Sequence, residues 1–159
     1  MAFSPEFYRS LPKKRMASGA LFFNETGKLL ILKPSYKGMW EIPGGAIEDD
    51  ESPRMAAERE IKEEIGLTKH VIKLMCVDYQ HADAARTESL MFVFNGGTLS
   101  NEDIKSILLD GKEILEFKFV TANEAFKLCG PRLGRRIQHI MAMKDTSGFL
   151  YLEDRELPL

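Results

Sequence analysis

Apolar and polar residues follow one another along the chain in short blocks that predict strands interspersed with helices. Residues 16–24 are small, apolar and aromatic, residues 28–33 are apolar between two lysines, and residues 25–27 have turn chemistry. This order predicts a β-hairpin. Further extended segments are expected at residues 39–42, 71–80, 88–95 and 113–120.

A helix is predicted over residues 53–65, where Ala57, Ile61 and Ile65 form an apolar ridge at a spacing of four. Ser52 suits the N-cap and Pro53 the first helical position. A glycine, Gly66, stands where a helix commonly ends in the left-handed conformation.

Two more helices are predicted near the end of the chain. Residues 121–128 open on the capping-box pair Thr121 and Glu124, and residues 133–144 are amphipathic. Residues 148–154 are read as a last strand or an extended tail. Strands interspersed with two or three helices predict an α/β or α+β sandwich. We expect a single domain over 1–159, with an irregular leader at 1–15 and a C-terminal extension at 145–159.

The composition fits an ordinary globular protein of 159 residues, with 44% apolar and 29% charged residues. The net charge of −2 argues against nucleic acid held on a general basic surface. Two cysteines in apolar surroundings predict buried, reduced thiols, and three scattered histidines argue against zinc. No apolar run is long enough for a membrane span or a secretory signal, so we expect a cytoplasmic protein.

Residues 45–67 carry an unusual concentration of acidic side chains. Glu60, Glu63 and Glu64 stand at i, i+3 and i+4 and therefore share one helical face. Like charges repel there, and Glu63 and Glu64 also lie in the last turn, where the helix dipole disfavours negative charge. A hard cation such as Mg²⁺ or Mn²⁺ would convert this repulsion into binding energy.

The same stretch has a fixed spacing of glycine, acidic and basic residues. Nine positions match a known pattern over 23 residues: Gly45, Glu51, Arg59, Glu60, Ile61, Glu63, Glu64, Gly66 and Leu67. This resembles the signature box of the Nudix (MutT-like) hydrolases, and residues 38–45 look like the family's usual run into that box. The order of strands and helices extends the resemblance to about residues 16–144.

The resemblance implies an α/β fold, an α/β/α sandwich around a mixed β-sheet. It also implies hydrolysis of a phosphoanhydride in a nucleoside diphosphate linked to another moiety, with Mg²⁺ (or Mn²⁺) required. Family members often dimerise, which makes a homodimer an expected arrangement.

The resemblance assigns roles to the residues of the box. Glu60 and Glu64 would bind metal, Glu63 would bind it directly or through water, and the Gly44 or Gly45 carbonyl would complete the shell. Arg59 would hold the loop and helix together through Glu51.

The general base varies within the family, and the sequence leaves it open. Glu60 or Glu63 would serve, as would a distal acid at the start of the 113–120 strand. Glu113 is the first choice there, and it is also the expected distal acidic metal ligand. Glu116 is its competitor, and a role as an ordinary solvated glutamate is equally expected for either residue.

Four residues outside the box are weaker candidates for contact with a substrate. Lys33, Lys37 and Arg86 would meet phosphates, and Trp40 would stack on a nucleobase, although surface and core roles are more common for these types.

The substrate is not determined by the sequence. Residues 82–85 lack the marker residues typical of ADP-ribose or dinucleoside polyphosphate enzymes, so a nucleoside triphosphate or modified nucleotide is the default. A nucleotide sugar or ADP-ribose is the alternative substrate. A non-catalytic nucleotide sensor and an RNA 5′-end processing factor are competing functions.

Overall fold

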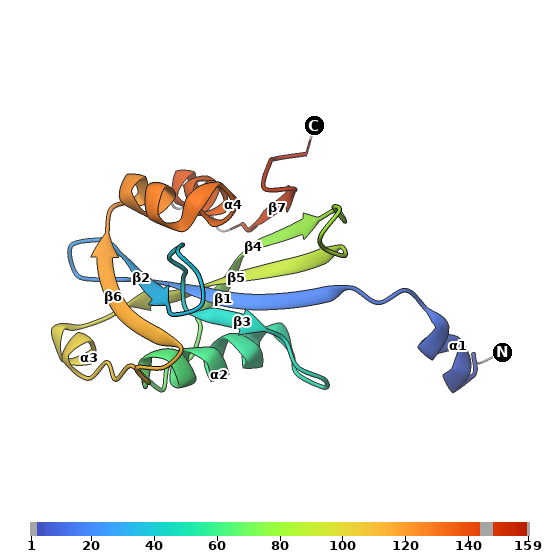
Figure 1. Ribbon diagram of the computed structural model, residues 1–159, viewed down its shortest axis with the longest axis horizontal. Coiled ribbons are helices and arrows are strands. Elements are labelled where there is room, and N and C mark those ends of the chain that lie inside the picture. Colours follow the sequence, from blue (N-terminus) through green and yellow to red (C-terminus); the bar gives the residue numbers. More distant parts are fainter. Residues whose placement is uncertain (1–2, 144–147, 159) are drawn as a thin grey trace.

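The computed structural model describes residues 3–143 and 148–158, which build a mixed sheet flanked by helices (Figure 1). The strands lie in the order β6-β2-β1-β5-β4-β7, and β3 pairs antiparallel with residues 17–19 of β1. The strands of the described residues are β1 (Arg15–Phe23), β2 (Leu29–Pro34), β3 (Gly44–Ala46), β4 (Lys73–Gln80), β5 (Ser89–Thr98), β6 (Ile114–Val120) and β7 (Leu150–Glu153). The helices are α1 (Pro5–Ser10), α2 (Pro53–Ile65), α3 (Asn101–Lys105) and α4 (Ala122–Ala142).

Strand β1 is the centre of the sheet. It pairs antiparallel with β2, as the predicted hairpin requires, and parallel with β5. Residues 18–22 of β1 are all buried, because helices cover both faces of the sheet here. The sheet is therefore mixed, as expected.

The two faces of the sheet carry separate apolar clusters. On one face α2 packs Ala57, Ile61 and Ile65 against Phe22 and Leu30. On the other face α4 packs residues such as Ile137 and Ile140 against Leu21 and Ile31. Figure 1 shows α4 and α2 on opposite sides of the sheet, which confirms the α/β/α sandwich.

The boundaries of α2 arise from local chemistry that the sequence already shows. The Ser52 hydroxyl accepts a hydrogen bond from the Met55 amide at 3.2 Å, and Pro53 fills the first turn. Gly66 ends the helix in the left-handed conformation, with a φ of 72°.

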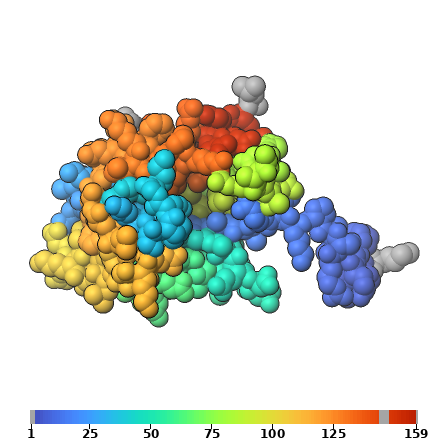
Figure 2. All heavy atoms as spheres, in the orientation of Figure 1, coloured from blue at the N-terminus to red at the C-terminus, as the bar shows by residue number. Residues whose placement is uncertain are grey.

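Several elements differ from the sequence-based expectation. Residues 1–15 were expected to be irregular, but residues 5–10 form α1, capped by Ser4 and projecting from the rest of the protein (Figures 1 and 2). The short extended piece at 39–42 is a single bridge between Leu32 and Glu41, and the strand that follows is β3.

The two predicted C-terminal helices both form, and together they make up α4. They meet at a break at Gly130, where φ is 70° and ψ is 177°. Gly130, with its positive φ, and the following Pro131 interrupt the helix. The predicted division into two helices is therefore confirmed. The last strand, β7, pairs parallel with β4. Residues 144–147 and 159, where the predicted helix ends and part of the predicted extension falls, lie outside the described residues.

Both cysteines, Cys76 and Cys129, are buried and free, and burial raises the pKa of each thiol to about 12. Within the described residues, no helix has the length and apolar character needed to cross a membrane.

A buried ion pair ties the C-terminal segment to the sheet. The Asp78 side chain, on β4, is fully buried and accepts hydrogen bonds from Arg136 of α4 at 3.0 and 2.6 Å. Its other oxygen accepts the Arg155 backbone N–H at 3.0 Å. One carboxylate therefore joins β4, α4 and the turn after β7.

Removal of this carboxylate leaves a buried guanidinium without a counter-charge. We expect Asp78→Ala to lower the free energy of unfolding by about 3–5 kcal/mol, measured by urea denaturation. Asp83→Ala removes the partner of Arg132 in an exposed pair and should cost no more than about 1 kcal/mol. Equal effects of the two substitutions would contradict a structural role for the buried pair.

Candidate active site

The acidic face of α2 meets the short strand β3, which continues the glycine-rich segment after Pro43. Gly45 lies so close to Glu60 that a Cβ atom at position 45 would stand 2.3 Å from Glu60 Oε1. Only glycine permits this approach without movement of the carboxylate. The loop and the helix thus form one unit around Glu60.

Arg59 bridges the loop and the helix. Its Nε and Nη2 donate to the two carboxylate oxygens of Glu51 at 2.8 and 3.0 Å, and Nη2 also donates to the Ala46 carbonyl at 3.0 Å. The contact with Glu51 is the one expected from the sequence. Nη1 also donates to Glu60 at 2.8 Å and to Glu63 at 2.9 Å, two contacts that the sequence did not indicate.

Glu64 is the most buried carboxylate of the box. Its side chain accepts a hydrogen bond from the Gly44 amide at 2.8 Å, and only 7% of the residue is exposed. Burial raises the pKa of Glu64 to about 8, and the negative charges of Glu60, Glu41 and Glu113 add to the effect. Ionisation of Glu64 is therefore unfavourable unless a cation lies nearby.

Glu60 and Glu63 differ in their surroundings. Burial raises the pKa of Glu60, while its contact with Arg59 acts in the opposite direction. The Glu63 side chain is 57% exposed and contacts solvent as well as Arg59. The three carboxylates thus present a graded series from buried to exposed along one helix face.

Within residues 3–143 and 148–158, no three Asp, Glu, His or Cys side chains already converge to hold a metal ion. Arg59 occupies oxygens of Glu60 and Glu63, and the Gly44 amide occupies one of Glu64. The donor chemistry nevertheless fits a hard divalent cation, because carboxylate oxygens with raised pKa values gain most from a neighbouring positive charge.

The structure distinguishes the two distal acids. Glu113 precedes β6, is exposed, and is among the charges that, after burial, raise the pKa of Glu60 and Glu64. Glu116 lies on β6 and pairs with Lys118 at 3.2 Å. Glu113 is therefore a distal acid whose charge reaches Glu60 and Glu64.

Glu41 is an acidic residue near the box that the sequence did not single out. It is held beside β2 by backbone hydrogen bonds with Leu32 at 2.7 and 2.8 Å, and its negative charge contributes to the raised pKa of Glu64. Its side chain pairs with Lys37. The sequence could have indicated Glu41 through its position directly before the Ile-Pro-Gly-Gly run that leads into the box.

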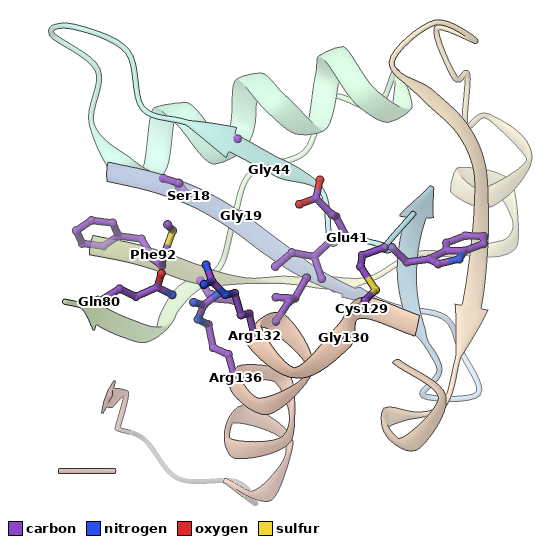
Figure 3. Close-up of a pocket in the computed structure, with 18 of the residues that line it drawn as sticks. Ser18, Gly19, Glu41, Gly44, Gln80, Phe92, Cys129, Gly130, Arg132 and Arg136 are labelled. Carbon is purple, nitrogen blue, oxygen red and sulfur yellow. The ribbon is translucent and has the colours of Figure 1, made fainter. Parts of the chain in front are cut away.

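A cleft of about 610 Å³ opens beside the glycine-rich segment (Figure 3). Glu41 and Gly44 lie at one end of this cleft and Gln80 at the other, with Phe92 and Arg132 also on its wall. Its walls come from β1, β4, β5 and the region around the break in α4. The cleft therefore connects the box to residues far away in the sequence.

The four weaker substrate candidates occupy different positions around the cleft. Lys37, Trp40 and Arg86 line it, whereas Lys33 does not. Trp40 is only 6% exposed, its amide donates to Leu128, and the amino groups of Lys118 and Lys33 stand 4.6 and 6.0 Å from its ring centroid. The indole thus packs mainly in the core.

Three arginines of the cleft were not among the four substrate candidates chosen from the sequence: Arg15, Arg132 and Arg136. They come from β1 and α4, and no spacing in the sequence relates them to one another or to the box. Only the packing of α4 on the sheet brings them together.

Comparison with known proteins agrees with this fold. The family model described as NUDIX domain matches residues 13–139. A MutT protein from Methanosarcina mazei Go1 has a solved structure that matches with a TM-score of 0.71 and 23% identity, covering 86% of this chain and all of that chain. Because the identity is low, this match concerns the fold alone.

Two curated relatives match shorter stretches. An RNA pyrophosphohydrolase of Marinomonas sp. is 39% identical over 57 residues, which is 36% of this chain and 35% of the relative. A MutT-like protein of Streptomyces ambofaciens is 34% identical over 70 residues, 44% of this chain and 46% of the relative. The chain thus spans less than half the length of either relative.

The family match covers most of the chain, and it includes the complete box and the sandwich that presents it. The protein belongs to the NUDIX family.

The raised pKa of Glu64 predicts how the stability of the metal-free protein depends on pH. The folded protein keeps the Glu64 proton up to about pH 8, whereas an unfolded glutamate loses it near 4.5. Folding is therefore favoured at low pH, and the free energy of unfolding should fall between these values, by an amount on the order of a few kcal/mol.

Urea denaturation in EDTA at pH 5, 6.5 and 8 measures this loss. Glu64→Gln keeps an acceptor for the Gly44 amide but cannot ionise, so its stability should fall less over the same range. Glu102→Gln, an exposed change on α3, should behave like the wild type. Parallel pH profiles for wild type and Glu64→Gln would show that this carboxyl is not the cause.

Proposed function

We propose that this protein is a Mg²⁺-dependent Nudix hydrolase that cleaves a phosphoanhydride bond in a nucleoside diphosphate linked to another moiety. The observation that carries the proposal is the complete acidic box, with Glu60, Glu63 and Glu64 on one helix face against Gly45. The names of the two curated relatives, one of them a pyrophosphohydrolase, support the same reaction class.

In this proposal Glu60 and Glu64 hold the metal, Glu63 holds it directly or through water, and the Gly45 carbonyl completes the set. A divalent ion bound there neutralises phosphate charge and acidifies a water molecule. Mg²⁺ suits oxygen ligands of this kind, and Mn²⁺ is the alternative.

Arg59 has a positioning role in this proposal. Its bidentate contact with Glu51 and its bond to the Ala46 carbonyl fix the helix relative to the loop. Metal binding would draw Glu60 and Glu63 away from the guanidinium, while Glu51 keeps that guanidinium in place.

The general base is assigned to a carboxylate that reaches the box. Glu60 and Glu63 lie within it, and Glu113 directly precedes β6. We favour Glu113 over Glu116, because Glu116 pairs with Lys118, whereas the charge of Glu113 helps to raise the pKa of Glu60 and Glu64.

For the substrate, a nucleoside triphosphate or a modified nucleotide is our first choice. The cleft beside the box is lined by apolar side chains such as Met91 and Phe92, which suit a nucleobase, and by arginines that suit phosphates. A nucleotide sugar or ADP-ribose is the alternative, and the similarity to an RNA pyrophosphohydrolase makes a 5′-phosphorylated RNA end a second candidate. A cytoplasmic location and a homodimer stay predictions.

The metal assignment is tested by neutral replacements in the box. We expect Glu60→Gln and Glu64→Gln each to lower kcat by about 100-fold or more, since each removes a charged metal ligand and the charge stabilisation that depends on it. The assay is Mg²⁺-dependent hydrolysis across nucleoside triphosphates, oxidised deoxynucleotides, nucleotide sugars and ADP-ribose. Glu102→Gln serves as the matched surface control. Full activity in either box variant would contradict the assignment.

The distal acid is tested by a second pair of variants. Glu113→Gln should lower kcat by about 10-fold or more, in line with loss of a general base, and remove the acidic limb of the pH profile. Glu116→Gln carries the same change three residues further along the chain, on β6, and should retain activity. If Glu113→Gln is fully active with an unchanged pH profile, the base lies within the box.

A further inference from the structure

The cleft continues into a second, smaller cavity of about 230 Å³. Arg15, Gln80, Arg86 and Arg132 line both spaces, so the two are parts of one groove. Glu41 and Gly44 lie at one end of the larger cleft and Gln80 at the other (Figure 3), and of these three residues only Gln80 also lines the smaller cavity. The groove thus runs from the glycine-rich segment before α2 to a cavity lined by several arginines.

The charges around the smaller cavity do not balance. Arg15, Arg86, Arg132 and Arg155 line it together with two acids, Asp83 and Asp154. Asp83 contacts Arg132 at 3.3 Å. Asp154 accepts hydrogen bonds from the His81 amide at 3.0 Å and contacts the His81 ring at 2.9 Å, with Arg155 at 3.6 Å. Both acids therefore already have partners: Asp83 contacts Arg132, and Asp154 contacts Arg155 and His81.

Two guanidinium groups keep an uncompensated charge. Arg15 donates to the Thr87 hydroxyl at 2.9 Å and to the Thr87 carbonyl at 2.8 Å, both of which are neutral. For the Arg86 side chain, no hydrogen bond or ion pair is found within the part of the chain that the structure describes. The nearby acid Glu88 is paired with Lys14 and Tyr79.

A buried hydroxyl in the same cavity also lacks a partner. Ser89 is 1% exposed, it lines the smaller cavity, and its Oγ has no hydrogen-bond partner among the described residues. Buried polar groups are normally satisfied, so an orphan hydroxyl beside two uncompensated arginines indicates a missing acceptor. Phosphate matches these donors, because its oxygens accept several charge-assisted bonds at once.

We propose that the smaller cavity binds a phosphate group on the nucleoside portion of the substrate, remote from the pyrophosphate that is cleaved. This inference rests on the proposed function and narrows its substrate class. The preferred substrates are nucleoside 5′-polyphosphates with a further phosphate on the sugar. That phosphate is either a terminal monoester or the link to a following nucleotide.

The test compares kcat/KM for three sets of probes with Mg²⁺. These are the four ribonucleoside 5′-triphosphates, the same compounds with a 3′-monophosphate, and 5′-triphosphorylated dinucleotides. We expect at least one phosphate-extended set to exceed its parent by about 10-fold or more, the usual size of a charge-assisted contact. The better of the two extended sets identifies the monoester or the oligonucleotide end as the source.

Substitution of Arg86 assigns the effect to this cavity. Arg86→Gln should bring the ratio between extended and parent substrates close to one, and Arg86→Lys should restore part of it. Arg54→Gln, a matched change on α2, should leave the ratio unchanged. A wild-type ratio near one would overturn the inference while the proposed function stands. A high ratio that survives Arg86→Gln would also overturn it.

A complete absence of hydrolysis would count against the proposed function and not against the cavity. In that case calorimetric binding of nucleoside 3′,5′-bisphosphates, compared with 5′-monophosphates, tests the cavity directly. Binding at least about 10-fold tighter and dependent on Arg86 would support the inference. Equal binding of the two compounds would overturn it.

Discussion

The guanidinium of Arg59 is the interaction on which the acidic box depends. Glu60 and Glu63 would repel one another on a bare helix, and Glu51 adds a third negative charge from the loop before it, but each of the three accepts a hydrogen bond from this one side chain. The hydrogen bond from Arg59 to the Ala46 carbonyl also connects this side chain to β3. Because Gly45 packs directly on Glu60, the loop and the helix together hold this carboxylate in place.

The sheet explains why this box faces a groove. Strand β1 pairs with β3 over part of its length and with β5 along its whole length. The glycine-rich segment and the cleft wall formed by β5 are therefore held by the same central strand. Helix α4 closes the groove from the other face, and its break at Gly130 lies on the cleft wall. The buried pair of Asp78 and Arg136 fixes α4 against β4.

Local signals in the sequence predicted much of the fold. The hairpin, the caps of α2 and the division of α4 at Gly130 all depend on residues within a few positions of one another. Helix α1 was missed because Pro5 and the capping Ser4 start a helix too short to show an apolar period. The 39–42 segment makes only one bridge, since Pro43 then interrupts the ladder.

The sequence by itself determined the acidic box, because its residues lie within one helix and the loop before it, where spacing alone fixes which side chains share a face. Only the tertiary structure decided what faces that box. The distal Glu113, the neighbouring Glu41 and the arginines of the groove come from separate elements, and no periodicity relates them. Their arrangement arises from strand order and helix packing, which depend on the burial of apolar surface over the whole chain.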